Sequence, residues 1–183
     1  MRSPFYFLQT MKRVIAKHPE WKGKISFHHV GETPFWVSEM LNEIDPGISF
    51  TSHGYLNQGK VAEAMAGFDL LLATSEKVLN DEHYCLPSKL FTYLQSGKPV
   101  IGFVTKGIQK DFIERSGGGM TFDPDDTEGS ALHLEEILVS GINMKLNREY
   151  LEQFNSKYTN AQFLEIVKSV STSDHMLHNN ASY

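Results

Sequence analysis

The stretch LPSKLFTYLQSGKPVIGF, residues 86–103, decides the fold class of this chain. Pro87 suits the first turn of a helix, and an apolar helix face follows it. Gly-Lys-Pro at 97–99 ends that helix, and a run of β-forming residues comes directly after it. A helix that returns through a short turn into an apolar strand is typical of α/β proteins.

Short apolar strands alternate with helices along the rest of the chain. We predict helices at 3–18, 33–41, 58–68, 87–95, 108–115, 127–139, 147–154 and 159–170, and strands at 25–30, 48–50, 69–73, 99–104 and 119–122. This alternation predicts an α/β fold with a Rossmann-like, doubly wound, mostly parallel sheet. Residues 1–170 are expected to form one domain, and the polar residues 171–183 a flexible tail.

Ligands of such sheets bind at the carboxyl ends of the strands. The loops that follow the predicted strands therefore matter most for function. They are 31–34, 51–57, 74–88 and 104–108.

Composition narrows the class of protein. A net charge of −5 argues against a general nucleic-acid-binding surface. Cys85 is the single cysteine, so no intramolecular disulfide can form, which fits a reducing compartment. No apolar run approaches the roughly 18 residues of a membrane-spanning helix, and no signal peptide is recognised. We therefore expect a soluble, cytoplasmic protein.

Several common catalytic motifs are missing from the sequence. It contains no G-x-G-x-x-G after a strand, no phosphate-binding P-loop, no nucleophile elbow and no H-E-x-x-H. His28 and His29 are neighbours in a predicted strand, so their side chains point to opposite faces and cannot chelate one metal together. We expect each of them to be a packed or hydrogen-bonded histidine, and we expect no metal site.

Lys89 is the unusual residue of the opening stretch. It falls in the first turn of the predicted helix, where backbone N–H groups of Ser88, Lys89 and Leu90 lack intrahelical partners and the helix dipole is positive. A lysine there costs a few tenths of a kcal/mol when it is exposed. A bound diphosphate would turn this cost into a charge-assisted contact. The alternative is that Lys89 extends into water.

The surrounding sequence carries a family resemblance. HGYLNQGKVAEAMAGFDLLLATS at 53–75 and the stretch 86–126, which ends in MTFDPDD, resemble the nucleotide-sugar-binding half of a GT-B glycosyltransferase. The pattern P-x-K-L-F-x-Y-L-x-x-G-K-P-V-I is similar to family 4, the retaining enzymes that build bacterial surface polysaccharides. The resemblance covers residues 2–140.

This resemblance implies roles for individual positions. Arg2 and Lys89 would hold the donor diphosphate and stabilise the leaving group electrostatically. Gly31 and Glu32 would line a loop of the donor site. Gly54, Tyr55 and Leu56 would shape the pocket for the nucleotide base, and Glu82 would approach the sugar. The start of the helix, at Pro87, Ser88 and Leu90, would lie against the phosphates.

Alternatives stay open at four of these positions. Gly31 and Gly54 could be plain turn glycines, Tyr55 an ordinary packing residue, and Glu82 a solvated loop carboxylate. Thr92 departs from the family pattern, because it stands where a glutamate usually contacts the donor ribose. Its hydroxyl can still form a hydrogen bond, but a neutral contact is weaker than one to a carboxylate.

The family's donor domain begins with a strand in the middle of its sheet, whereas this sequence begins with the helix after that strand. We therefore expect a fragment of a longer enzyme, with the first central strand missing and the gap filled by a rearranged order, a partner chain or distortion. The N-terminal acceptor-binding domain would be a partner.

The resemblance implies transfer of a sugar from a nucleoside-diphosphate sugar, a substrate and not a cofactor, to a glycan or lipid-linked acceptor. The full-length protein would act in the cytoplasm, with contact to the inner membrane face. A GT-B sugar-nucleotide epimerase and a degenerate, non-catalytic donor domain are the alternative functions.

Overall fold

The computed structural model describes residues 3–75 and 84–178. By compactness the chain divides into a first unit, residues 1–146, and a second unit, residues 147–183.

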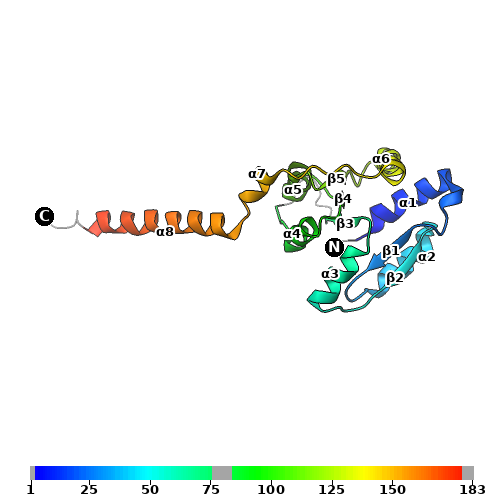
Figure 1. Cartoon of the computed structure of the whole chain (residues 1–183), viewed down its shortest axis with the longest axis horizontal. Helices are drawn as coiled ribbons and strands as arrows, with labels where there is room; N and C mark the ends of the chain where they lie inside the picture. The colour runs from blue at the N-terminus through cyan, green and yellow to red at the C-terminus, as the bar shows by residue number, and fades with distance from the viewer. Residues whose placement is uncertain (1–2, 76–83, 179–183) are drawn as a thin grey trace. The chain divides into compact units, whose positions relative to one another are not determined.

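The first unit alternates strands and helices in the predicted order (Figure 1). Its elements are α1 (Phe5–Lys17), the short 3-10 helix η1 (Pro19–Trp21), β1 (Ser26–His29), α2 (Phe35–Ile44), β2 (Ser49–Ser52), α3 (Gln58–Ala66), β3 (Leu71–Thr74), α4 (Ser88–Gln95), β4 (Val100–Phe103), α5 (Ile108–Ser116), β5 (Gly119–Phe122) and α6 (Thr127–Ser140). The predicted α/β class is confirmed.

All pairing between the named strands is parallel, but the sheet is present in two parts. β1 pairs with β2, with Phe27 beside Phe50, and β3, β4 and β5 form a second sheet in chain order. Within the described residues no strand joins β1 to β3. Among the described residues the break therefore separates the first two strands of the chain from the three that follow. That a central strand is missing stays a prediction.

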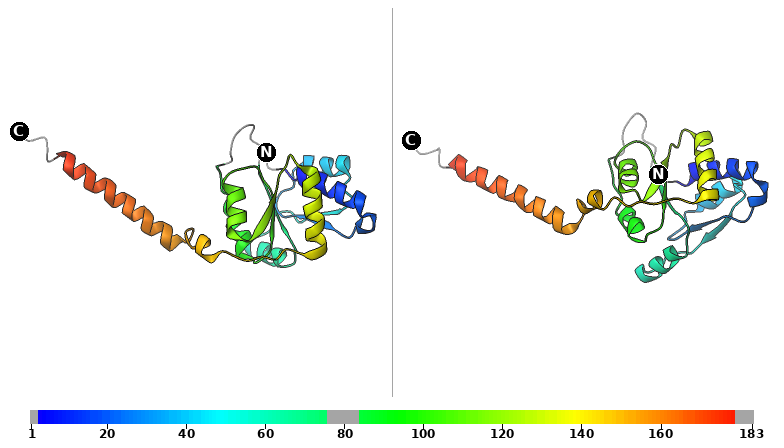
Figure 2. Two further views of the ribbon diagram at one scale, coloured as in Figure 1. Left: turned by 90° about the horizontal axis from the view of Figure 1, so that it is seen from above. Right: turned by 45° about the horizontal axis from the view of Figure 1, so that its top comes forward.

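Helices cover both faces of the three-stranded sheet (Figure 2). α4 and α5 lie on one face, while α1 and α6 lie on the other and pack on each other. Phe103 of β4 is stacked on Phe122 at a centroid distance of 4.9 Å and meets Phe7 of α1 edge-on at 5.9 Å. The apolar face of α1 also reaches the two-stranded sheet, where Phe7 lies 5.6 Å from Phe27. α1 is therefore the helix that holds the two sheets together.

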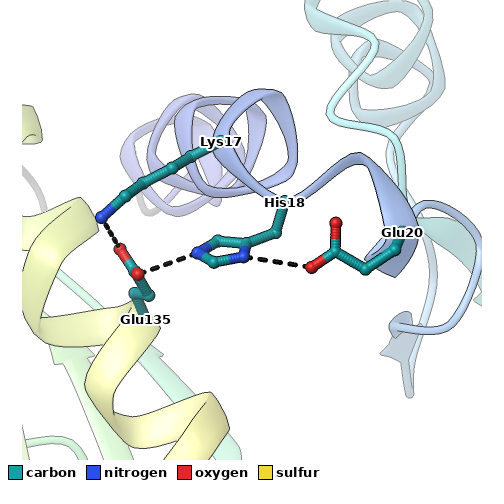
Figure 3. Close-up of polar contacts among 4 residues, drawn as sticks. All are labelled: Lys17, His18, Glu20 and Glu135. Carbon is teal, nitrogen blue, oxygen red and sulfur yellow. Dashed lines mark hydrogen bonds and ion pairs between the residues drawn. The ribbon is translucent and has the colours of Figure 1, made fainter.

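A polar network fastens the end of α1 to α6 (Figure 3). Glu135 of α6 accepts hydrogen bonds from Lys17 Nζ at 2.5 Å and pairs with His18 Nε2 at 2.8 Å. The other ring nitrogen of His18 lies 3.2 Å from Glu20. Glu135 holds the pKa of His18 above its ordinary value, and Lys17 and His18 lower the pKa of Glu135.

The second unit contains α7 (Arg148–Glu152) and α8 (Ser156–His178). The last helix was predicted to end at residue 170, but α8 continues to His178. Its apolar side chains Phe163, Ile166, Val167 and Val170 are exposed. That residues 147–170 belong to the donor-binding domain stays a prediction.

Candidate functional site

Hydroxyl and imidazole groups gather where β1 and β2 end. His29 is the last residue of β1, and its Nδ1 lies 2.9 Å from the hydroxyl of Thr33, in the loop before α2. The Thr33 hydroxyl lies 2.7 Å from that of Ser52, the last residue of β2. Since parallel strands end at the same edge of a sheet, three chain segments contribute to one hydrogen-bonded cluster.

The carboxyl ends of β3 and β4 are joined in a similar way. Ser75 follows β3 and is buried, and its Oγ accepts the backbone N–H of Thr105 at 3.0 Å. The two hydroxyls are 3.5 Å apart. This contact fixes the loop after β4 against the end of β3.

The beginning of α4 differs from the prediction in two details. Pro87 lies at the N-cap position with extended backbone angles, so it precedes the helix instead of forming its first turn. The N–H of Leu90 donates to the Pro87 carbonyl at 3.1 Å, and Leu90 is only 1% exposed. The expectation that Leu90 offers a free amide to a ligand is therefore wrong. Leu90 instead anchors the start of the helix in the core.

The helix starts of the first unit differ in their caps. The side chain of Asn57 accepts the N–H of Lys60 in α3, and that of Asp126 accepts the N–H of Gly129 in α6. At α4 the N-cap is a proline, which provides no side-chain cap. An uncapped helix start can offer its first amides and its positive dipole to an anion.

Lys89 lies in this first turn and lines the same cleft as His29, the last residue of β1. Burial lowers the pKa of His29, and the positive charge of Lys89 lowers it further. The imidazole of His29 is therefore largely neutral near neutral pH, beside a lysine cation. Both residues line one cleft, together with Glu32 and Thr92. Lys89, Thr92 and Glu32, three of the predicted donor-binding positions, thus line one cleft, and that they bind a donor stays a prediction.

The two predicted glycine turns meet each other. The N–H of Gly31 donates to the carbonyl of Gly54 at 2.8 Å, which forms an isolated antiparallel bridge. Both glycines have positive φ, +122° and +63°, a backbone region that favours glycine. Next to this bridge Tyr55 is 90% exposed, so the alternative that it packs in the protein is wrong. Leu56 beside it is partly buried.

The remaining predicted positions are either exposed near the start of α4 or outside the described residues. Ser88 is exposed at the start of α4, and Cys85 is exposed before it. Arg2 and Glu82, predicted for the diphosphate and the sugar, lie outside the described residues. Their roles stay predictions.

Residues 3–140 match the model of the glycosyl transferases group 1 family. The chain belongs to this family. The match covers every strand of the first unit and ends at the last residue of α6. As a group 1 glycosyl transferase domain, the chain serves glycosyl transfer, and the family implies a nucleotide-sugar donor and an acceptor. No curated protein and no solved structure matches the chain.

Two further properties concern membranes and metals. Within residues 3–75 and 84–178, no helix has both the length and the apolar character needed to span a bilayer. The same residues contain no group of three or more His, Cys, Asp and Glu side chains that could hold a metal ion.

Residue-by-residue reading of the sequence missed part of the site. It treated His29 as a packed or hydrogen-bonded histidine, which is confirmed, but gave it no place beside Lys89. It also gave no role to the hydroxyls of Thr33, Ser52, Ser75 and Thr105. Each of these residues lies at or just after the end of a strand. That position is the one signal that could have identified them.

Proposed function

We propose that the first unit of this group 1 glycosyl transferase binds the diphosphate of a nucleoside-diphosphate sugar at the start of α4. The intact protein would transfer the sugar, a hexose, to a glycan or lipid-linked acceptor in surface polysaccharide synthesis. The observation that carries this proposal is Lys89 in a first turn without a side-chain cap, in the cleft that His29 lines at the carboxyl end of β1.

The electrostatics of this position favour a dianion. A lysine near the positive end of a helix is unfavourable by itself, by a few tenths of a kcal/mol at an exposed position. A diphosphate between Lys89 and the first amides of α4 would interact favourably with both. In the transition state the same charges would stabilise the departing nucleoside diphosphate.

At the ends of β1 and β2 the described residues of the site offer neutral hydrogen-bonding groups and no second positive charge. Burial and the charge of Lys89 lower the pKa of His29, which disfavours its charged form, and His29 lies in a chain with the hydroxyls of Thr33 and Ser52. Neutral imidazole and hydroxyl groups both donate and accept hydrogen bonds. They suit sugar hydroxyls and phosphate oxygens, while the lysine supplies the positive charge.

The proposed donor-binding unit would need a second, acceptor-binding domain to complete the active site. A catalytic base, if one is used, would come from an acceptor-binding domain, so the unit alone should bind donor weakly and transfer nothing. We place the intact protein at the inner face of the membrane, where a lipid-linked acceptor is available. Donor binding by the intact protein without turnover would instead favour a non-catalytic binding module, the function that Thr92 leaves open.

Nucleotide titration with a matched pair of variants tests the site. UDP, GDP and their sugars are titrated by calorimetry or NMR into the wild-type chain, Lys89→Ala and Lys60→Ala. Lys60 is also exposed in a first turn, but Asn57 already caps its helix, α3. Loss of a charge-assisted contact should weaken binding about 10- to 100-fold in Lys89→Ala and leave Lys60→Ala unchanged. Equal affinities in the two variants would reject the site.

A further inference from the structure

Two histidines face each other on neighbouring strands of the two-stranded sheet. His28 lies in β1, and His53 follows directly after β2, the strand that pairs with β1 (Figure 1). Nδ1 of His28 lies 2.9 Å from Nε2 of His53, and the ring centroids are 5.1 Å apart with 25° between the ring planes. At this distance the two nitrogens can share one proton, donated by one ring and accepted by the other.

This pair lies on the face of β1 that is opposite to His29. Successive side chains of a strand point to opposite faces, so His28 and its neighbour His29 cannot bind one ion together. Both partners of His28 come instead from its own face, Ser26 from the same strand and His53 from the end of the next strand. Neighbours along the chain do not indicate this pair, because the second imidazole is supplied by the pairing of β1 with β2.

Main-chain hydrogen bonds fix the positions from which the two rings project. His28 lies inside the β1–β2 ladder. The N–H of His53 donates to the carbonyl of His29 at 2.9 Å, and the carbonyl of the next residue, Gly54, accepts the N–H of Gly31 at 2.8 Å. His53 is therefore held between two bonds that continue the contact beyond the last residue of β2. Because the backbone is already ordered, a ligand of the two rings has to immobilise only side chains.

Ser26 orients the ring of His28. Its Oγ lies 2.9 Å from Nε2 of His28, which is the ring nitrogen that does not face His53. A serine hydroxyl can accept an imidazole N–H, and a proton on Nε2 leaves the Nδ1 lone pair of a neutral His28 directed at His53. Metal-binding histidines almost always donate their second ring N–H to an oxygen in this way. The ring of Phe68 flanks the pair, with centroid distances of 5.1 Å to His28 and 6.2 Å to His53.

The separation of the facing nitrogens is close to that of two ligands of one metal ion. Zn–N bonds of about 2.0–2.1 Å in tetrahedral geometry place two ligand nitrogens about 3.3 Å apart. The observed 2.9 Å has to widen by a few tenths of an ångström. His53 is exposed, so a small rotation of its side chain can supply this change while His28 keeps its contact with Ser26. The ring proton of His53 then moves from Nε2 to Nδ1, and two neutral imidazoles bind the ion without net loss of a proton.

We propose that His28 and His53 form a binding site for one divalent transition-metal ion, held through Nδ1 of His28 and Nε2 of His53. Imidazole suits Zn²⁺, Ni²⁺ and Cu²⁺, whereas Mg²⁺ and Ca²⁺ prefer oxygen ligands. Among the described residues no third His, Cys, Asp or Glu joins the pair, so water completes the coordination of the ion. The site goes beyond the proposed donor-binding function and does not depend on it.

NMR of the histidine rings tests the proposal, with Zn²⁺ as the probe. The ring signals are followed during Zn²⁺ titration of the wild-type chain, His53→Gln and His133→Gln. His133 is an exposed histidine of α6 and provides the matched control. In the wild-type chain and in His133→Gln, the signals of His28 and His53 should shift together with one apparent Kd. In His53→Gln the affinity at His28 should fall at least tenfold, because a lost ligand costs no less than an outer-shell contact, which is worth roughly 10- to 100-fold.

Two further titrations distinguish coordination from a general response to cations. Ser26→Ala keeps both ligands but removes the orienting oxygen, so Zn²⁺ binding should weaken about tenfold. Mg²⁺ should leave both ring signals of the wild-type chain unchanged. The proposal is overturned if His28 and His53 respond to Zn²⁺ with different affinities or no more strongly than His133. Wild-type affinity in His53→Gln, or an equal response to Mg²⁺, would also reject the site, and wild-type affinity in Ser26→Ala would reject coordination through Nδ1 of His28.

Discussion

The two sheets of the first unit are built from similar strand lengths but are stabilised differently. All four residues of β4 are buried, whereas Phe50 is the one residue of β2 that is not exposed. The three-stranded sheet is covered by helices on both faces, and its strands are continuous apolar runs. In the two-stranded sheet Phe27 and Phe50 face the interior, and serine, histidine and threonine take the alternate positions 26, 28, 49 and 51. His29 and Ser52 end the strands on the same face as the phenylalanines. Stability is concentrated in the three-stranded sheet, and the two-stranded sheet contributes His29 and Ser52 to the candidate site.

The largest difference should appear when one phenylalanine is removed from each sheet. Phe103→Ala empties a site that is 2% exposed and in contact with Phe122 and Phe7, so we expect it to lower the free energy of unfolding by about 3–5 kcal/mol. Phe50→Ala removes a half-buried ring that packs on Phe27, and should cost less than half as much. Urea unfolding of both variants measures the difference. Equal losses would mean that the two sheets share one core of uniform stability.

A smaller effect is expected from adding a single methyl group where β4 and β5 meet. A Cβ at Gly119 would collide with the backbone carbonyl of Val100, which cannot move without breaking the β4–β5 ladder. We expect Gly119→Ala to destabilise the chain by about 1–3 kcal/mol. Gly59→Ala in α3 is the matched control, since its Cβ would meet only Asn57 at 3.7 Å, and it should be neutral or slightly stabilising. A neutral Gly119→Ala, seen as an unchanged thermal midpoint, would contradict the tight packing of this pair.

The sequence predicts the order of helices and strands well, but it does not predict the contacts between distant segments. Strands of the three-stranded sheet are short apolar runs such as VIGF, and helices between them have clear periodicity, so the element order follows from local pattern. Gly31 and Gly54 were singled out by the family resemblance, with plain turn glycines as the alternative, and both have positive φ. The pairing of their loops is a long-range contact, and so are the approach of Lys89 to His29 and the bond between Ser75 and Thr105. Local pattern cannot give such contacts, because they depend on how the strand ends are placed in space.

The start of α4 shows that the sequence does not fix the position of a helix end to within one residue. The sequence correctly indicates a helix after Pro87, but not whether the proline lies inside the first turn or just before it. That one-residue difference decides which amides are available, because a carbonyl at the N-cap accepts the N–H of Leu90. Predicting a ligand site therefore requires the cap geometry, which the residue types alone do not define.

The smallest predicted effect concerns the contact that holds α1, and with it the two-stranded sheet, against α6. His18 and Glu135 have side chains only 23% and 20% exposed, and Trp21 stacks on His18 at 4.1 Å. The pKa of His18 is raised above 6.5 by Glu135, so its contribution to stability is complete below pH 6.5 and is lost as the pH rises through the folded-state value. The pKa of Glu135 is lowered below 4.5, chiefly by Lys17, so its contribution is complete above pH 4.5 and is lost on acidification. Between these values both partners contribute, and the α1–α6 contact should be strongest there.

A comparison of Glu135→Gln with Glu136→Gln distinguishes the specific contact between His18 and Glu135 from the general effect of negative charge on α6. NMR titration of the His18 ring should give a pKa above 6.5 in the wild-type chain and in Glu136→Gln, whose side chain is the exposed neighbour on α6. Glu135→Gln should return the pKa of His18 toward 6.5, because the carboxylate that chiefly stabilises the charged ring is removed. The stability difference between the two variants should then shrink as the pH rises above 6.5, by much less than either core substitution costs. If Glu136→Gln lowers the pKa of His18 as much as Glu135→Gln does, the elevation reflects the summed charge of α6, and the link between the helices is not the specific pair drawn in Figure 3.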